Sequence, residues 1–115
     1  MSHDEKTEAQ SKLAATCEAA DVWRCHVYRH WDEGGEYGEY VVFAVTLDEA
    51  TLEPLVHYYS LKYKTRWSRK LTVFTEHLGT AGPRRFARVR RASFEEVAAA
   101  LGVSVTRSFS MTELP

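Results

Sequence analysis

Two neighbouring segments, residues 40–47 and 55–63, alternate between two sets of side chains with a period of two. On one side of the first fall Val41, Phe43, Val45 and Leu47, and on one side of the second fall Leu55, His57, Tyr59, Leu61 and Tyr63. Because successive side chains of a strand point to opposite faces, this period indicates strands rather than helices. Residues 48–54 between them end in a proline and are typical of a turn. We therefore predict two adjacent antiparallel strands.

Further segments carry weaker forms of these patterns. We predict strands at residues 23–31, 66–74, 84–91 and 103–110, and helices at residues 7–20 and 94–101. In the strand at 66–74, Trp67, Arg69, Leu71 and Val73 share one face, and we expect Leu71 and Val73 to be buried. In the strand at 84–91, an edge strand, Phe86, Arg88 and Arg90 oppose Ala87 and Val89.

Capping residues set the expected limits of the two helices. Thr7 with Gln10 fits a capping box at the start of the first helix, whose thin apolar stripe suits an edge position. Ser93 with Glu96 fits a second capping box, and Gly102 is a typical stop.

The order of these elements predicts a fold class. We expect one domain over residues 1–115, of α+β class and mainly β, with a core at about 22–91. Short sequential strands joined by turns suggest a small antiparallel barrel with one N-terminal and one C-terminal helix at its periphery.

Composition bears on the compartment. The first dozen residues are polar and mixed in charge, so we expect no signal peptide. The longest apolar run, Tyr40 to Val45, is too short to span a membrane. The two cysteines form no disulfide framework. We expect a cytoplasmic protein with reduced thiols and no membrane partner.

Charge is distributed unevenly along the chain. Residues 62–91 carry ten of the fifteen Lys and Arg and one acidic residue, a balance of +9, whereas residues 1–61 stand at −8. Such a segment can bind a nucleic acid or an acidic protein, and it can equally pair with the chain's own carboxylates or with a second copy. The candidate partner-binding residues are Arg66, Lys70, Arg84, Arg85, Arg88, Arg90 and Arg91.

Two other binding hypotheses rest on weaker patterns. Cys17, Cys25, His26 and His30 are residue types that zinc prefers, but there is no Cys-x-x-Cys pair, and two histidines four apart in a strand lie roughly 13 Å apart. We therefore assign no metal ligand. Residues 93–107 begin like a helix-turn-helix, yet residues after Gly102 alternate with period two where a recognition helix is required.

The middle of the chain resembles an uncharacterised family of short bacterial domains. The matching residues are Tyr28, His30 and Trp31, then Thr51, Glu53, Pro54, Leu55, Val56 and Tyr58, then Trp67, Arg69, Leu71, Phe74 and Glu76. The chain departs from the family pattern at residues 32–34, where Asp-Glu-Gly replaces Lys-Gly, and at Lys70, which replaces a proline. Over residues 28–78 the resemblance implies a small SH3-like barrel, and it implies no activity.

Such a barrel brings together a candidate ligand site. Aromatic walls with one cation and one titratable ring suit an anionic or planar ligand, although the same rings can simply fill the barrel. The candidate residues are His30, Trp31, Tyr58, Trp67 and Arg69. Because a buried charge needs a partner, we expect Arg69 either to meet a carboxylate, with Glu53 as the best candidate, or to line an opening beside Trp67.

Catalytic patterns are missing from the sequence. It contains no Gly-rich phosphate loop, no nucleophile elbow and no His-Glu-x-x-His motif, so we assign neither catalytic residues nor a cofactor. The sequence therefore predicts a module that recognises a protein or nucleic acid through residues 62–91. The alternative is a small-molecule-binding or enzymatic role at the His30, Tyr58, Trp67 and Arg69 cluster.

Overall fold

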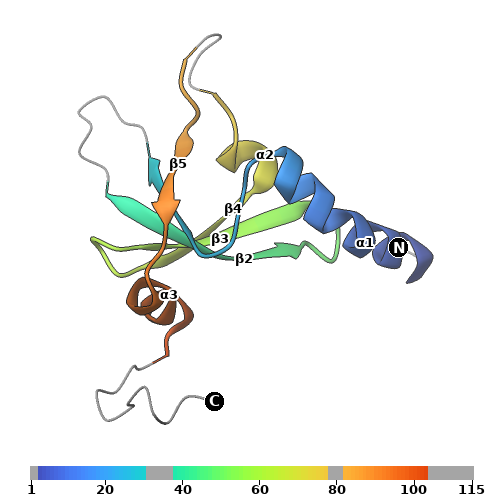
Figure 1. The fold of residues 1–115 in the computed structure, drawn as a ribbon. Coiled ribbons are helices and arrows are strands. Elements are labelled where there is room, and N and C mark those ends of the chain that lie inside the picture. Colours follow the sequence, from blue (N-terminus) through green and yellow to red (C-terminus); the bar gives the residue numbers. More distant parts are fainter. Residues whose placement is uncertain (1–2, 31–37, 78–81, 104–115) are drawn as a thin grey trace.

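The structure, a computed structural model, describes residues 3–30, 38–77 and 82–103. In this part of the chain, α1 (His3–Ala19) precedes β1 (His26–His30), β2 (Glu39–Leu47), β3 (Pro54–Ser60) and β4 (Arg66–Lys70). The short α2 (Leu71–Phe74), β5 (Phe86–Arg91) and α3 (Phe94–Leu101) follow (Figure 1). The predicted class, mainly β with helices, is confirmed. The strand predicted at 103–110 lies almost entirely outside the described residues.

The five strands form one antiparallel sheet in the order β4-β3-β2-β1-β5. The predicted pairing of residues 40–47 with 55–63 is confirmed by the β2–β3 ladder, in which Val42 lies opposite Tyr58. In the described residues β4 and β5 are the two edges and do not pair with each other. The sheet is therefore open, and the predicted closure into an SH3-like barrel is not confirmed.

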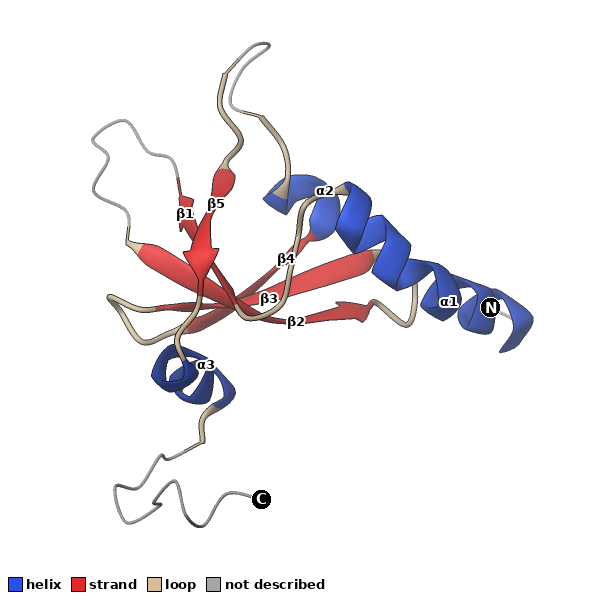
Figure 2. Ribbon diagram, in the orientation of Figure 1, coloured by secondary structure: helices blue, strands red, loops and turns tan. Residues whose placement is uncertain are grey.

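The open sheet is nevertheless strongly curled (Figure 2). Strands lie about 4.8 Å apart, so β4 and β5 would be roughly 19 Å apart in a flat sheet. Yet the guanidinium carbon of Arg69 in β4 lies 5.7 Å from the ring centroid of Phe86 in β5. The concave face is filled by one hydrophobic cluster, formed by Val22, Tyr28, Val42, Val56, Tyr58, Leu71, Phe74 and Phe86.

The segment predicted as one strand at 66–74 divides into β4 and α2. Leu71 and Phe74 are both buried in the concave cluster. Three positions apart, they would point to opposite faces of a strand but share one side of a helical turn. The prediction for Leu71 is confirmed, whereas Val73 is only half-buried. Burial of Leu71 and Phe74 on one face thus accounts for the end of the strand.

α3 covers the convex face of the sheet, where Ala100 packs in a second cluster with Val27, Val41 and Tyr59. Its predicted capping box is confirmed, because the Ser93 side chain accepts from the Glu96 backbone and the Glu96 side chain from the Ser93 backbone. Gly102 ends the helix with φ at 75°. A side chain is strained in this left-handed conformation, which explains the glycine.

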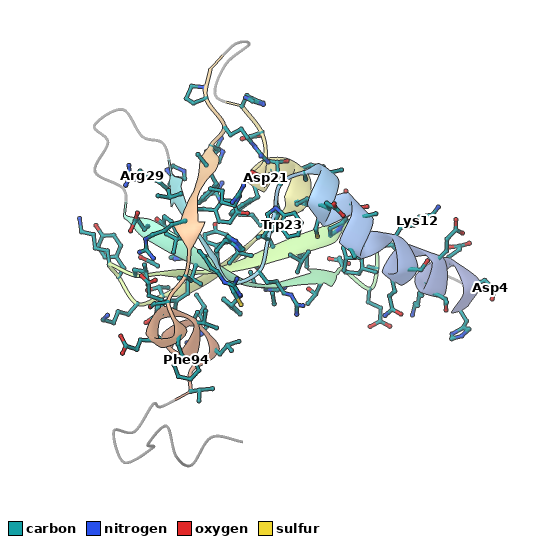
Figure 3. The ribbon with its side chains drawn as sticks, in the orientation of Figure 1. Asp4, Lys12, Asp21, Trp23, Arg29 and Phe94 are labelled. Carbon is teal, nitrogen blue, oxygen red and sulfur yellow. The ribbon has the colours of Figure 1, made fainter. Side chains whose placement is uncertain are left out.

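α1 projects from the sheet, and Figure 3 shows Asp4 and Lys12 on its projecting part. The predicted stripe is half-buried at Ala9, Leu13 and Cys17, but no residue of α1 is fully buried. The predicted start at Thr7 is wrong: the helix begins at His3, and the Thr7 hydroxyl donates to the His3 carbonyl. No helix in the described residues is long and apolar enough to cross a bilayer.

Two irregularities in pairing interrupt the predicted alternation. In β2 the register shifts between Val42 and Ala44, so Val45 joins Tyr40 and Val42 on the concave side while Phe43 packs with the convex cluster. The prediction that Phe43 and Val45 share a face is therefore wrong. An extra residue in one strand of a pair causes this change, which is a β-bulge.

The second bulge lies in β5, where Val27 pairs with Arg90 and Tyr28 with Arg88, leaving Val89 without an opposite residue. Directly opposite residues of an antiparallel pair share a face. Tyr28 belongs to the concave cluster and Val27 to the convex one, so Arg88 and Arg90 point to opposite faces. The predicted common face of these two arginines is wrong.

Candidate ligand-binding cleft

A cleft of about 590 Å³ opens at the concave side of the sheet. Side chains from all five strands and from the turn after β3 contribute to its wall. The lining residues are His30, Tyr40, Tyr58, Tyr63, Trp67, Ser68, Arg69 and Phe86. The size suits a small molecule or a short side chain of a partner.

Phe86 lies at the centre of the aromatic floor. Its ring stacks on Phe74 at a centroid distance of 4.3 Å and an interplanar angle of 8°. The rings of His30, Tyr58 and Tyr40 surround it with centroid distances of 4.7, 5.2 and 5.7 Å. Phe86 and Phe74 are fully buried. The floor is therefore held in place by the core itself.

Arg69 brings a positive charge into the cleft, and its hydrogen-bond partner is a neutral hydroxyl. Its Nε donates to the Tyr58 hydroxyl at 2.8 Å, and its guanidinium lies over the Phe86 ring. Glu53 instead pairs with Lys70 at 3.1 Å, so the predicted contact between Arg69 and Glu53 is wrong. Within the described residues no carboxylate neutralises Arg69. The second predicted arrangement, Arg69 at an opening beside Trp67, matches the geometry.

The Tyr58 hydroxyl remains protonated at neutral pH. Burial raises its pKa above the ordinary value of 10.0, and the hydrogen bond from Arg69 offsets this only in part. An oxygen that accepts from Arg69 still has its own proton to donate. Arg69 and Tyr58 therefore present hydrogen-bond donors to a ligand in the cleft.

The rim is formed by two exposed aromatic side chains. Trp67 is 56% exposed and Tyr63 is 64% exposed, large values for rings of this size. Both line the cleft, Trp67 from β4 and Tyr63 from the turn before it. These rings offer flat apolar surface at the entrance.

The structure brings together four of the residues that the sequence singled out for a ligand, namely His30, Tyr58, Trp67 and Arg69. Trp31 lies outside the described residues. The sequence reasoning missed Tyr40, Tyr63, Ser68 and Phe86. Tyr40 could have been found, because the predicted hairpin puts it on the same face as Val42 and hence Tyr58. Phe86 could not, because its place depends on the β1–β5 pairing between distant segments.

The candidate cations of residues 62–91 do not gather in one free patch. Three of them pair with nearby carboxylates: Arg85 with Glu76, Arg88 with Asp21 at 3.1 Å, and Arg90 with Glu96 at 2.7 Å and Glu39 at 3.3 Å. Lys70 has Glu53. Arg84 donates to the Ala20 carbonyl, and Arg66 to the carbonyls of Ala99 and Ala100. Arg91 is exposed and contacts no carboxylate among the described residues.

The electrostatic consequence is strongest at Arg90. Its hydrogen bonds lower the pKa of Glu96 to about 2. Partial burial alone would raise the pKa of Asp21, but hydrogen bonds from Trp23 and Arg88 lower it below the ordinary value. The internal pairing that the sequence left open as an alternative is thus what the structure shows for these arginines.

Cys17, Cys25, His26 and His30 do not form a metal-binding cluster in the described residues. The described part of the chain holds no group of three or more His, Cys, Asp or Glu that could bind a metal ion. Cys17 is half-buried, which raises the pKa of its thiol, and His26 Nδ1 lies 3.0 Å from the Arg24 carbonyl oxygen.

The comparisons with known proteins agree with this fold. No curated protein matches the chain. A crystal structure of a DUF1653 protein from Bordetella bronchiseptica is similar, with 28% sequence identity and a TM-score of 0.50, over 64% of this chain and 96% of that one. Residues 26–88 match the family described as "Protein of unknown function (DUF1653)". The resemblance inferred from residues 28–78 is therefore confirmed, and the chain belongs to the DUF1653 family.

Proposed function

We propose that the chain is a recognition domain that binds an anionic group carried on a flat apolar body in the concave cleft. The observation that carries the proposal is Arg69, a cation inside an aromatic cleft whose hydrogen-bond partner is a neutral phenol. Among the described residues neither of its two Nη groups has a hydrogen-bond partner, so both can bind a carboxylate or a phosphate.

The same geometry disfavours a cationic ligand. Rings such as Tyr40, Trp67 and Phe86 could form a cage for an ammonium group, since such cages bind cations through their faces. Arg69 already holds a positive charge over Phe86 in the same cleft. A second cation there would be repelled, whereas an anion gains charge-assisted hydrogen bonds that contribute about 1.5–3 kcal/mol each.

Binding accounts for the cleft better than catalysis does. The described residues that line it include no carboxylate and no cysteine. Arg69, the Tyr58 hydroxyl and the aromatic floor orient and hold a ligand, which is the role of the few polar groups in a mostly apolar site. An enzymatic role at the same residues is the alternative, and it would require a reactive group in addition to those that hold the ligand.

Recognition of a nucleic acid or acidic protein through residues 62–91 has weaker support. A polyanion would have to displace the carboxylates of Asp21, Glu39 and Glu96 from Arg88 and Arg90. Those two arginines also lie on opposite faces of the sheet. The cleft needs no such displacement, because Arg69 has no carboxylate partner in the described residues.

The test is a titration of the full chain with benzoate, followed by amide chemical shifts. Benzylamine, which has the same ring and the opposite charge, is the matched ligand. We expect benzoate to shift the amides of residues 67–69, and Arg69→Met to weaken its binding about tenfold or more, as loss of a charge-assisted contact requires.

Arg91→Met is the matched protein control, because it removes the same charge from an exposed position away from the cleft. It should leave benzoate binding unchanged. Equal binding of benzylamine, or equal affinity of the Arg69→Met variant for benzoate, would overturn the proposal.

A further inference from the structure

In the part of the chain that the structure describes, β4 is an edge strand, and one side of its backbone has no neighbouring strand. The amide of Ser60 donates to the Thr65 carbonyl at 2.8 Å, in the same register that pairs Tyr58 with Trp67. In an antiparallel ladder, hydrogen-bonded pairs alternate with pairs that make no such bonds. The backbones of Trp67 and Arg69 therefore bond to β3, and the N–H and C=O of Ser68 point to the free edge.

The cleft reaches this free edge. Trp67, Ser68 and Arg69 all line it although they are consecutive. Successive side chains of a strand lie on opposite faces, so a cleft on the concave face alone would meet only every second residue. Contact with Ser68 places the cleft along the edge of β4 as well as over its concave face. A ligand in the cleft lies within reach of the backbone that can add another strand.

From this geometry we infer the class of ligand. We propose that an extended peptide with an acidic residue two positions before an aromatic one adds to β4 as a sixth, antiparallel strand. This rests on the proposed function, because the acidic side chain takes the place of the anion at Arg69. The aromatic side chain then lies against Trp67, and the residue between them exchanges backbone hydrogen bonds with Ser68.

The register follows from the alternation. The peptide residue opposite Ser68 forms a hydrogen-bonded pair, so those opposite Arg69 and Trp67 form non-hydrogen-bonded pairs, in which side chains approach more closely. Opposite charges and paired aromatic rings at such positions stabilise a ladder. Antiparallel addition continues the direction of every strand pair in this sheet.

A second copy of the chain fits this edge less well. Pairing β4 with another β4 around Ser68 would bring Arg66 of each copy opposite Lys70 of the other. Like charges across a ladder are destabilising, and cations on an edge strand are a known protection against self-pairing. An acidic strand at the same edge would instead be attracted by these cations.

The probe is the capped peptide acetyl-Thr-Thr-Glu-Thr-Phe-Thr-Thr-amide, titrated against the full chain. The first control exchanges Glu with the central Thr, which keeps the composition but turns the acid to the other face. The second is N-methylated at the central Thr, which removes the hydrogen bond to the Ser68 carbonyl. We expect the probe to compete with benzoate and to slow hydrogen exchange of the Ser68 amide. Its affinity should be at least about five times that of either control, because each control lacks one contact.

Ser68→Pro supplies the test on the protein side. Proline removes only an N–H that points to the free edge, a position where strands tolerate it. The variant should lose peptide binding, and this loss should exceed any change in its affinity for benzoate. Equal affinity for the probe and the N-methylated peptide would overturn strand addition, as would a dimer in sedimentation whose Ser68 amide is protected without peptide.

The outcomes separate this inference from the proposed function. If benzoate binds through Arg69 but the probe peptide binds no better than its controls, strand addition is wrong and the anion site stands. Failure of benzoate and of the peptide together removes both.

Discussion

The cleft and the β5 edge both carry arginines, but the side chains of these arginines have different partners. At β5, Arg88 and Arg90 meet Asp21, Glu39 and Glu96. In the cleft, Arg69 meets a phenol and the face of Phe86. The charges of Arg88 and Arg90 are therefore neutralised by the chain's own carboxylates, whereas the charge of Arg69 remains available to a ligand. The number of cations in a segment therefore says little about how many can bind a partner.

The largest expected effect comes from Phe86, which belongs to both regions. It begins β5, is fully buried and forms the floor of the cleft. Phe86→Ala should lower the free energy of unfolding by about 3–5 kcal/mol, because it leaves a cavity among packed rings. Urea unfolding measures this. Val89→Ala, at the exposed bulge, is the control and should change stability by no more than about 0.5 kcal/mol. Similar losses in the two variants would show that the two regions are not joined through Phe86.

The next effect separates paired from available arginines. The double variant Arg88→Glu, Arg90→Glu should unfold at a lower temperature than the unaltered chain, since it removes these ion pairs and places acidic side chains beside Asp21, Glu39 and Glu96. Arg69→Met should lose less stability, because its hydrogen-bond partner is a neutral hydroxyl. Thermal unfolding at matched ionic strength checks the order. A larger loss for Arg69→Met would reverse the comparison.

A smaller effect follows from acid. The pKa of Glu96 is about 2 in the folded chain against an ordinary 4.5, so its carboxylate favours the folded state above pH 4.5. That contribution is lost as the pH falls from 4.5 through about 2. Glu96→Gln should therefore unfold more easily than the unaltered chain at pH 6, and the difference should shrink as the pH approaches 2. A constant difference across this range would show that Arg90 does not hold the carboxylate.

The smallest effect concerns polyanions. At physiological salt we expect no measurable affinity of the chain for single- or double-stranded oligonucleotides, because Arg88 and Arg90 of β5 already have carboxylate partners. Weak binding at low salt should disappear as salt is raised, as counterion release requires. Affinity that persists at physiological salt and falls in the double variant would restore the basic segment as the binding surface.

Local patterns predicted most elements of the fold. The β2–β3 hairpin and the capping box of α3 follow from period-two alternation and from Ser93 with Glu96. The bulges at Phe43 and Val89 could not be predicted, because an extra residue leaves the alternation of the sequence intact and changes only the pairing. Those bulges decide which face Val45 and Arg90 occupy. The open sheet depends in turn on pairings between distant strands.

The candidate site was predictable in part for the same reason. Trp67 and Arg69 lie on one face of a single strand, which alternation alone indicates. The partner of Arg69 was not predictable from charge. Leu55 lies opposite Lys70, so Glu53, two residues before Leu55, falls on the face of Lys70 and away from Arg69. Register, more than proximity in the sequence, selected the ion pair.

Arg66 has a mechanical consequence. Its guanidinium holds the Ala99 and Ala100 carbonyls, at 3.0 and 2.8 Å, at the end of α3. A pulling force applied beyond Gly102 would therefore pass into β4 through these bonds, as well as along the backbone into β5. Because β4 is an edge held by one ladder only, α3 and β4 should yield together under load, ahead of the hairpin that carries the aromatic floor.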